Sequence, residues 1–412
     1  MREVRQKKTF FQKVAEFLFV VYLSTVYMFD TQYDKVYISH IFFILFAGTA
    51  AVYFLQRKRF YLGKNVLLMY FFCTWIFASV FWAANEYIAN MMIKTMWQIF
   101  ILFFIVYNLF CEKKTEDAYE FYIKALYTAG IVFVVYTMCT YGVTDVIKMM
   151  SDGNNVRIGA DVAQTNTFGI NHATTTIIAF YYLIYKSKHR LFHMVVLFLT
   201  FVFAMASGSR TAVLIICIGA LYLIYRRYSL RKFYKTIVVI LLVIIVFVSA
   251  IQLPMFETVR LRMEQMVNNI IGTSGGDSSS RVRMNMILIG WKLLQQRMLT
   301  GYGAGNYGYV SNYNTYAHNN FVEILVDYGL IGFIVCYTTY IIAFKNLRKN
   351  KSSSAKVLFC IFIVKFLMEI ATITYYDKLH WIMLAFCLMQ KREETIQLQE
   401  ETGVKLRNEK LY

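Results

Sequence analysis

Charged residues are scarce in this sequence: Asp, Glu, Lys and Arg make up 16% of its 412 residues, whereas hydrophobic residues make up 58%. Soluble proteins carry about 25% charged residues, so this chain has too little charge to cover a solvated surface. The formal net charge of +19 does not indicate a nucleic-acid-binding protein, because such a protein needs a solvated basic face. The seven cysteines have no paired spacing, which argues against a disulfide framework or a zinc site. The composition instead predicts a polytopic membrane protein.

The apolar runs predict an all-α polytopic fold with about twelve transmembrane helices. A helix of about 20 apolar residues crosses a hydrocarbon core of about 30 Å, and several of the runs are shorter than this. The predicted spans are residues 14–29, 36–56, 65–84, 91–111, 119–141, 169–185, 191–206, 211–225, 236–253, 317–344, 355–374 and 379–390.

The chain divides into four parts, since one of the connections between predicted spans is far longer than the others and a polar tail follows the last span. Within it, apolar residues keep helical spacing over 256–271 and 283–299, which predicts two helices at or above the outer face. The four parts are 1–253 with nine helices and an outer loop at 142–168, a large extracytoplasmic loop at 254–316, 317–390 with three helices, and a cytoplasmic tail at 391–412.

Lys and Arg are distributed as expected for a chain with both termini in the cytoplasm. If the N-terminus is inside, every inside segment is basic, which matches the enrichment of Lys and Arg in cytoplasmic loops. Each outside connection except residues 254–316 holds only one or two basic residues. The few basic residues on the outside therefore need an explanation of their own.

Two outside arginines, Arg210 and Arg281, are candidates for binding an anion, and a third, Arg283, has a simpler explanation. Arg210 follows Ser207-Gly208-Ser209 between two apolar spans, where it either snorkels to the interface or forms an anion site with the flanking small residues. Arg281 lies in the first turn of the helix predicted after a serine-rich run, where the helix dipole disfavours a cation unless an anion is nearby. Arg283 is expected on a solvated face of the same helix.

His318 begins the tenth predicted span and is the candidate general base. A histidine at a helix start is often a capping or interfacial residue, but neutral imidazole can also accept a proton from a hydroxyl nucleophile. Glu323 and Asp327 lie one to two turns deeper on one face. Intramembrane carboxylates suggest function, and the alternative is a structural polar pair that closes the helix.

Several other polar features have simpler explanations. The outer loop at 142–168 contributes Arg157, and His172 is expected to cap or line the entrance of the sixth span. Lys365 and Glu369, four residues apart, favour a buried structural ion pair. Residues 303–308 match Gly-x-Gly-x-x-Gly, but no strand precedes them and the loop faces away from cytoplasmic nucleotide.

A group of short motifs resembles the O-antigen ligase and Wzy-type polymerase superfamily. The resemblance covers residues 157–332, and it depends on the order of the motifs and their common side of the membrane. The motifs are Ser207-Gly208-Ser209-Arg210, Ser280-Arg281, Thr300-Gly301-Tyr302-Gly303-Ala304-Gly305, Ala317-His318-Asn319, Gly329-Leu330-Ile331-Gly332, and the segment from Arg157-Ile158-Gly159 to Asn171-His172.

The resemblance implies a GT-C-like, metal-independent, inverting glycosyltransferase without a cofactor. An enzyme of this type is expected to act on glycans linked to undecaprenyl diphosphate, outside the cytoplasmic membrane. By this resemblance His318 deprotonates the acceptor hydroxyl, while Arg210 and Arg281, joined by Arg157, hold the diphosphate. The remaining candidates for lining the substrate are Ser209, His172, Asn319, Glu323 and Arg283.

The shared motifs do not separate a polymerase of repeat units from a ligase that transfers the finished glycan. A composition rich in Lys, Tyr and Ile is similar to that of low-GC Gram-positive bacteria, which lack a lipid A acceptor, and this favours a capsular or exopolysaccharide polymerase over an O-antigen ligase. A lipid-linked oligosaccharide flippase is the rival from another class, although no half-to-half symmetry is evident. The expected partners are the lipid-linked donor and acceptor, the bilayer, a flippase and a chain-length regulator, with no nucleic acid.

Overall fold

The computed structural model describes residues 9–32, 34–58, 60–142, 144, 158–186, 188–228, 252, 256–271 and 278–389. Within these ranges the chain is helical and contains no strand, which confirms the all-α prediction. Most of the ninth predicted span, Arg157, the serine-rich run up to Asp277 and the predicted cytoplasmic tail lie outside the described residues.

The helices follow the predicted apolar runs closely. Helix α13 is a single turn that the sequence did not indicate. The elements are α1 (Phe10–Phe29), α2 (Val36–Arg57), α3 (Lys64–Ala78), the 3-10 turn η1 (Ser79–Trp82), α4 (Glu86–Phe110), α5 (Thr115–Tyr141), α7 (Thr165–Tyr185), α8 (Arg190–Ala206), α9 (Arg210–Tyr228), α11 (Glu257–Ile271), α12 (Ser278–Gln296), α13 (Tyr307–Val310), α14 (Asn320–Lys349), α15 (Ser353–Met368) and α16 (Lys378–Cys387).

Six of the described helices are long and apolar enough to cross a membrane: α1, α2, α3 with η1, α4, α5 and α14. Helices α8 and α16 are apolar but shorter. These features make the chain a membrane protein of several spans. The count of twelve and the orientation of the termini remain predictions.

Side-chain caps explain where several of these helices begin. An Asn, Ser, Thr or Asp side chain at this position accepts a hydrogen bond from one of the first free backbone N–H groups. Thr9 accepts from Gln12 before α1, Asn85 from Ile88 before α4, Asn319 from Val322 before α14, Ser352 from Ala355 before α15, and Asp377 from Leu379 before α16.

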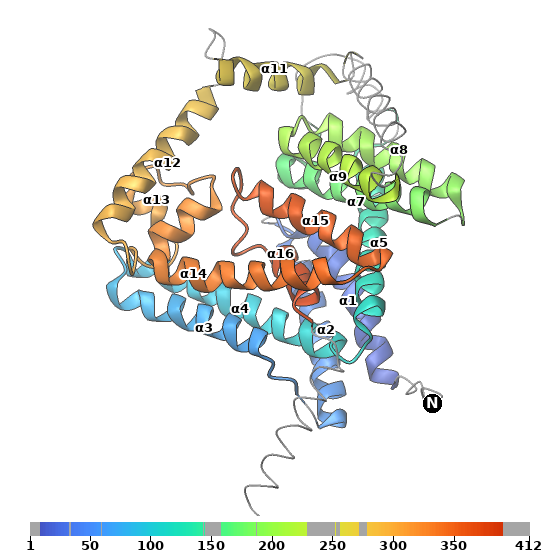
Figure 1. Ribbon diagram of the computed structural model, residues 1–412, viewed down its shortest axis with the longest axis horizontal. Coiled ribbons are helices and arrows are strands. Elements are labelled where there is room, and N and C mark those ends of the chain that lie inside the picture. The colour runs from blue at the N-terminus through green and yellow to red at the C-terminus, as the bar shows by residue number, and fades with distance from the viewer. Residues whose placement is uncertain are drawn as a thin grey trace, which may run out of the picture.

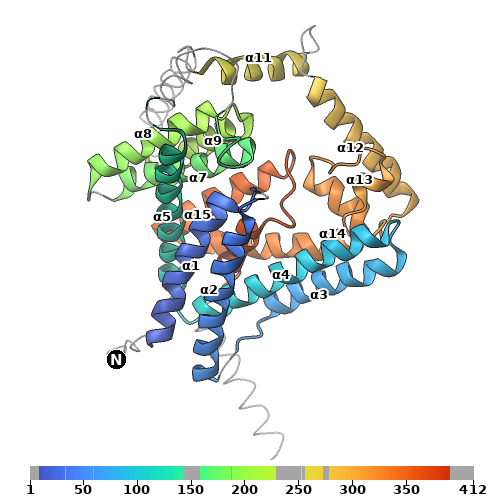
Figure 2. The ribbon, with the colours of Figure 1, turned by 180° about the vertical axis from the view of Figure 1, so that it is seen from behind.

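Two groups of helices within the packed molecule position the site, and α15 joins them because it contacts α9 as well as α14. Helix α14 lies against α3, α15 and α16, and α16 also packs on α4 (Figure 1). Helices α7, α8 and α9 pack on one another (Figure 2). Of the two helices predicted at 256–271 and 283–299, α11 lies on α8 and α9, whereas α12 lies on α14. The described parts of the large loop therefore contact both groups.

A backbone break in α14 receives the glycine-rich segment. Gly329 has φ 65° and ψ −170° inside the helix, and a Cβ atom there would lie 2.2 Å from the Leu299 carbonyl oxygen. The break leaves helix carbonyls free, so the Tyr302 and Gly303 N–H groups donate to the carbonyls of Val326 and Asp327 at 2.8 and 2.9 Å. The glycines of this segment thus make close helix packing possible and do not form a nucleotide-binding turn.

The beginning of α14 is also anchored to the connection between α15 and α16. The Asn320 side chain accepts hydrogen bonds from the backbone N–H groups of Thr374 and Tyr375, and donates to Glu369. The Tyr337 hydroxyl donates to the same Glu369 carboxylate at 2.7 Å. Glu369 is therefore held by neutral donors, and the Lys365–Glu369 ion pair expected from the sequence is not among the ion pairs of the described residues.

Candidate active site

The backbone around His318 is held by buried groups of α14. His318 has φ 53°, in the left-handed region, immediately before the helix. On one side, the Ala317 N–H donates to Glu323 Oε2 at 2.5 Å. On the other side, Asn319 Nδ2 donates to the Ile370 carbonyl oxygen at 3.2 Å. Since both neighbours are anchored, the position of His318 is determined by the helix packing.

The His318 ring is partly buried and carries no charge near neutral pH. Its centroid lies 4.3 Å from that of Tyr316. Two causes together lower the pKa of His318 from 6.5 to about 4: burial, which is the larger, and the positive charge of Arg283. A histidine with this pKa is neutral at pH 7, so one ring nitrogen is free to accept a proton.

The two carboxylates of α14 support the chain around the site. Asp327 is fully buried, and it accepts hydrogen bonds from the N–H groups of Gly305 and Tyr307 and from the Tyr375 hydroxyl, at 3.1, 2.7 and 3.2 Å. Glu323 is 4% exposed and binds the backbone next to His318. The geometry favours the structural alternative for the pair, and it leaves little of Glu323 for contact with a substrate.

The two arginines at the start of α12 lie on different faces. Residues two positions apart on a helix do not face each other. Arg281 is exposed, whereas Arg283 is partly buried on the face that carries the buried residues Met286 and Gly290. The positive charge of Arg283 acts on His318. Arg283, which the sequence predicted on a solvated face, is thus only partly exposed.

The Ser207–Arg210 segment forms a tight turn between α8 and α9. Gly208 has φ 63°, and Ser209 Oγ accepts a hydrogen bond from the Ala212 N–H at 3.4 Å, so Ser209 caps α9 and is nearly inaccessible. Arg210 is partly exposed at the first position of α9. From α11, Arg262 Nη1 donates to the Gly208 carbonyl oxygen at 3.1 Å. Arg262 is one of the basic residues of the predicted loop at 254–316, but nothing in the sequence indicated that it contacts this turn.

His172 does not line the entrance of a span, contrary to expectation. It is fully buried within α7, and its ring centroid lies 4.7, 4.5 and 5.1 Å from those of Phe133, Phe168 and Phe203. Neither ring nitrogen has a hydrogen-bond partner. Aromatic packing against its own helix and two others, α5 and α8, therefore explains this residue, and a substrate could not reach it.

Among the described residues, no three His, Cys, Asp or Glu side chains gather where they could hold a metal ion. Arg157 lies outside the described residues, and its role as a third diphosphate ligand remains a prediction. The nearest described neighbour, Ile158, is buried, and its N–H donates to the Ala206 carbonyl oxygen at 3.2 Å. The chain just after Arg157 is thus attached to the end of α8, next to the Ser207–Arg210 turn.

Comparison with known proteins gives one family. Residues 195–337 match the O-antigen ligase family, and no curated protein matches the chain. The matched region runs from α8 through the first half of α14, so it includes Arg210, Arg281, Arg283 and His318. Residues 195–337 are therefore similar to the O-antigen ligase family, which supports the resemblance to the O-antigen ligase and Wzy-type polymerase superfamily.

Proposed function

We propose that this protein is a glycosyltransferase that joins undecaprenyl-diphosphate-linked oligosaccharide repeat units into a polysaccharide on the outer face of the cytoplasmic membrane. The observation that carries the proposal is a neutral His318, anchored through Ala317 and Asn319 and placed beside Arg283, within the region that matches the O-antigen ligase family. The polytopic helical fold supports a membrane-embedded lipid substrate.

The proposed reaction is an inverting transfer. The acceptor hydroxyl oxygen attacks the anomeric carbon of the donor sugar from the face opposite the diphosphate, and His318 takes the hydroxyl proton. The new glycosidic bond forms as the bond to the diphosphate breaks, and undecaprenyl diphosphate leaves with the electron pair. Arginine side chains stabilise the negative charge that develops on this leaving group.

The arginines have different places in this scheme. Arg210, Arg281 and Arg157 remain the proposed diphosphate ligands, with Arg210 at the start of α9 and Arg281 exposed on α12. We add Arg283, because its charge already acts on His318. A bound diphosphate next to Arg283 offsets that positive charge, so donor binding raises the pKa of His318 and makes it a stronger base when the acceptor is present.

Replacement of the proposed base tests this function. We expect His318→Ala and Arg281→Ala each to abolish long-chain polysaccharide, with the His318 variant slowed by about 100-fold or more. Membrane insertion and protein level should stay normal. His40→Ala, which removes an exposed histidine of α2, is the matched control and should leave chain length unchanged. Wild-type chain length in His318→Ala contradicts the assignment of the base.

A ligase is the second candidate, because the matched family carries that name. A ligase uses the same donor but transfers the finished glycan to another acceptor. The chain length of the lipid-linked pool separates the two: loss of a polymerase leaves single repeat units on the lipid, whereas loss of a ligase leaves long polymer that is not transferred. A flippase, the candidate from another class, predicts that His318→Ala retains normal polymer.

A further inference from the structure

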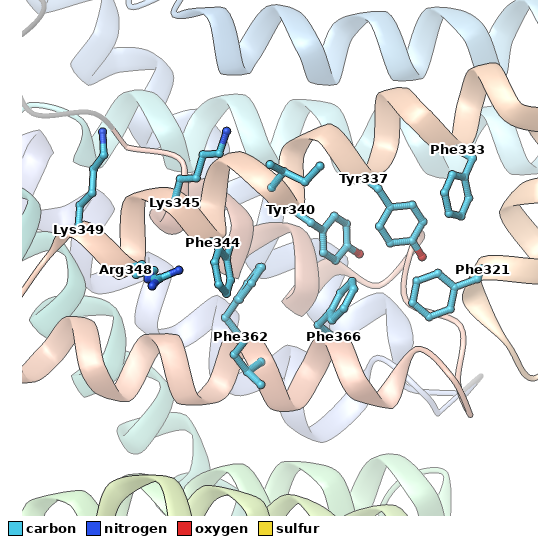
Figure 3. A pocket seen from close by; sticks show the side chains of 12 residues that line it. Phe321, Phe333, Tyr337, Tyr340, Phe344, Lys345, Arg348, Lys349, Phe362 and Phe366 are labelled. Carbon is cyan, nitrogen blue, oxygen red and sulfur yellow. The ribbon is translucent and has the colours of Figure 1, made fainter. Parts of the chain in front are cut away.

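An apolar groove lies between α14 and α15, on a part of the molecule that the proposed reaction does not use. Its volume is about 850 Å³, which is within the range of sites that enclose a ligand. Aromatic side chains from both helices line it, including Tyr340 and Phe344 of α14 and Phe362 and Phe366 of α15 (Figure 3). A long apolar chain fits such a lining.

One end of the groove is strongly basic. Lys345, Arg348 and Lys349 lie together at that end, while Phe321 and Phe333 lie at the other (Figure 3). All three cations are exposed, and the lining residues include no acid. The groove therefore combines an apolar body with a concentrated positive charge at its mouth.

The basic end is far from the candidate active site. Lys345 lies 16 residues beyond the break at Gly329, so the unbroken second part of α14 alone carries it about 24 Å from the break at a rise of 1.5 Å per residue. His318 lies before the first part of the helix, on the other side of the break. The three cations cannot therefore contact a diphosphate held at His318. The distribution of Lys and Arg in the sequence predicts that these cations lie on the cytoplasmic side.

We propose that this groove binds an anionic phospholipid of the cytoplasmic leaflet. Its phosphate contacts Lys345, Arg348 and Lys349, and an acyl chain lies along the aromatic side chains between α14 and α15. Basic pockets between membrane helices on the cytoplasmic side recognise anionic headgroups, and long cationic side chains reach the headgroup level from a helix end. Charge complementarity thus selects an anionic lipid over a zwitterionic one.

The test compares lipid binding by the full chain, purified in detergent and stripped of lipid. Phosphatidylglycerol and phosphatidylcholine with the same acyl chains are titrated separately, with bound lipid counted by native mass spectrometry and the thermal midpoint followed in parallel. We expect phosphatidylglycerol to bind more tightly and to raise the midpoint. Each cation near the surface contributes about a fivefold factor in affinity, so K345Q/R348Q/K349Q should weaken phosphatidylglycerol binding by about a hundredfold.

Two further variants keep the proposal falsifiable. K351Q/K356Q removes two neighbouring cations, one between α14 and α15 and one in the first turn of α15, that do not line the groove, and it should retain wild-type affinity. Ile363→Trp fills the groove without changing its charge and should weaken binding of the acyl chain. Circular dichroism of each variant checks that it is folded.

Three outcomes overturn the proposal. Equal affinity for the two lipids shows that the headgroup is not recognised. Wild-type affinity of the folded K345Q/R348Q/K349Q variant shows that the lipid binds elsewhere. An equal rise in the thermal midpoint with inorganic phosphate alone, unaffected by Ile363→Trp, shows that the cations bind a free anion and that the groove has no part in it.

Discussion

Arg283→Gln should move the acid side of the pH–activity profile to higher pH. In the wild-type protein, burial and the charge of Arg283 hold the pKa of His318 at about 4. Protonation of the base abolishes activity, so the wild-type rate should fall on the acid side with a midpoint near pH 4. As far as His318 controls it, the rate should be constant between about pH 5.5 and 7.5. Glutamine preserves much of the bulk of Arg283 and removes its charge.

The size of the expected change follows from the order of the two causes. Burial lowers the pKa of His318 more than Arg283 does. Removal of the Arg283 charge should therefore raise this pKa by less than half of the difference between about 4 and the ordinary value of 6.5. The midpoint in Arg283→Gln should therefore rise above pH 4 and remain below pH 6.5. The shift should shrink at high ionic strength, although a partly buried charge is screened less than an exposed one.

The assay is the initial rate of glycan transfer from a synthetic undecaprenyl-diphosphate donor, measured against pH at substrate concentrations well below KM. Under these conditions kcat/KM reports groups of the free enzyme. Lys292→Gln is the matched control: it removes an equal charge from an exposed position of the same helix, α12, and should leave the midpoint in place. A wild-type midpoint near 6.5, or an unchanged midpoint in Arg283→Gln, refutes the electrostatic coupling of Arg283 to His318.

Two predictions concern the packing behind the site. Asp327→Ala should lower the free energy of unfolding by about 3–9 kcal/mol, because three donors lose their acceptor at about 1–3 kcal/mol each. Unfolding in a detergent titration measures this, and Asp34→Ala, which removes an exposed carboxylate, should show almost no change. His172→Phe should keep full activity and equal or raise the free energy of unfolding, because the ring nitrogens have no partner and an unpaired buried polar group is costly. A strong loss of transfer in a folded His172→Phe protein would show that the residue has a role beyond packing.

Much of the secondary structure could be predicted because a membrane limits the choices for the backbone. Every N–H and C=O group in the hydrocarbon core must be paired within the chain, so a long apolar run becomes a helix. The runs at 36–56 and 119–141 correspond to α2 and α5, and the amphipathic stretch at 283–299 corresponds to α12. The choice of His318 also needed only the sequence, since polar groups are rare in this chain and gather near that residue.

The faces of the helices could not be predicted in the same way. Val282, Met284 and Leu288 on α12 are exposed, while Met286 and Leu294 are buried, so apolar residues surround the helix and hydropathy does not show which side meets protein. The sequence therefore did not show that the charge of Arg283 acts on His318. His172 was misplaced for a related reason, because its cage draws Phe133 and Phe203 from other helices.

The sequence alone predicted a helical membrane protein that resembles the O-antigen ligase and Wzy-type superfamily, with His318 as the candidate base. Only the tertiary structure decided that Gly329 breaks α14, that the glycine-rich segment fills this break, and that Glu323 and Asp327 hold the backbone near the histidine. Composition and spacing along one helix reveal which residues are apolar or polar. Hydrogen bonds between segments far apart in the sequence depend on how helices pack, which local patterns do not encode.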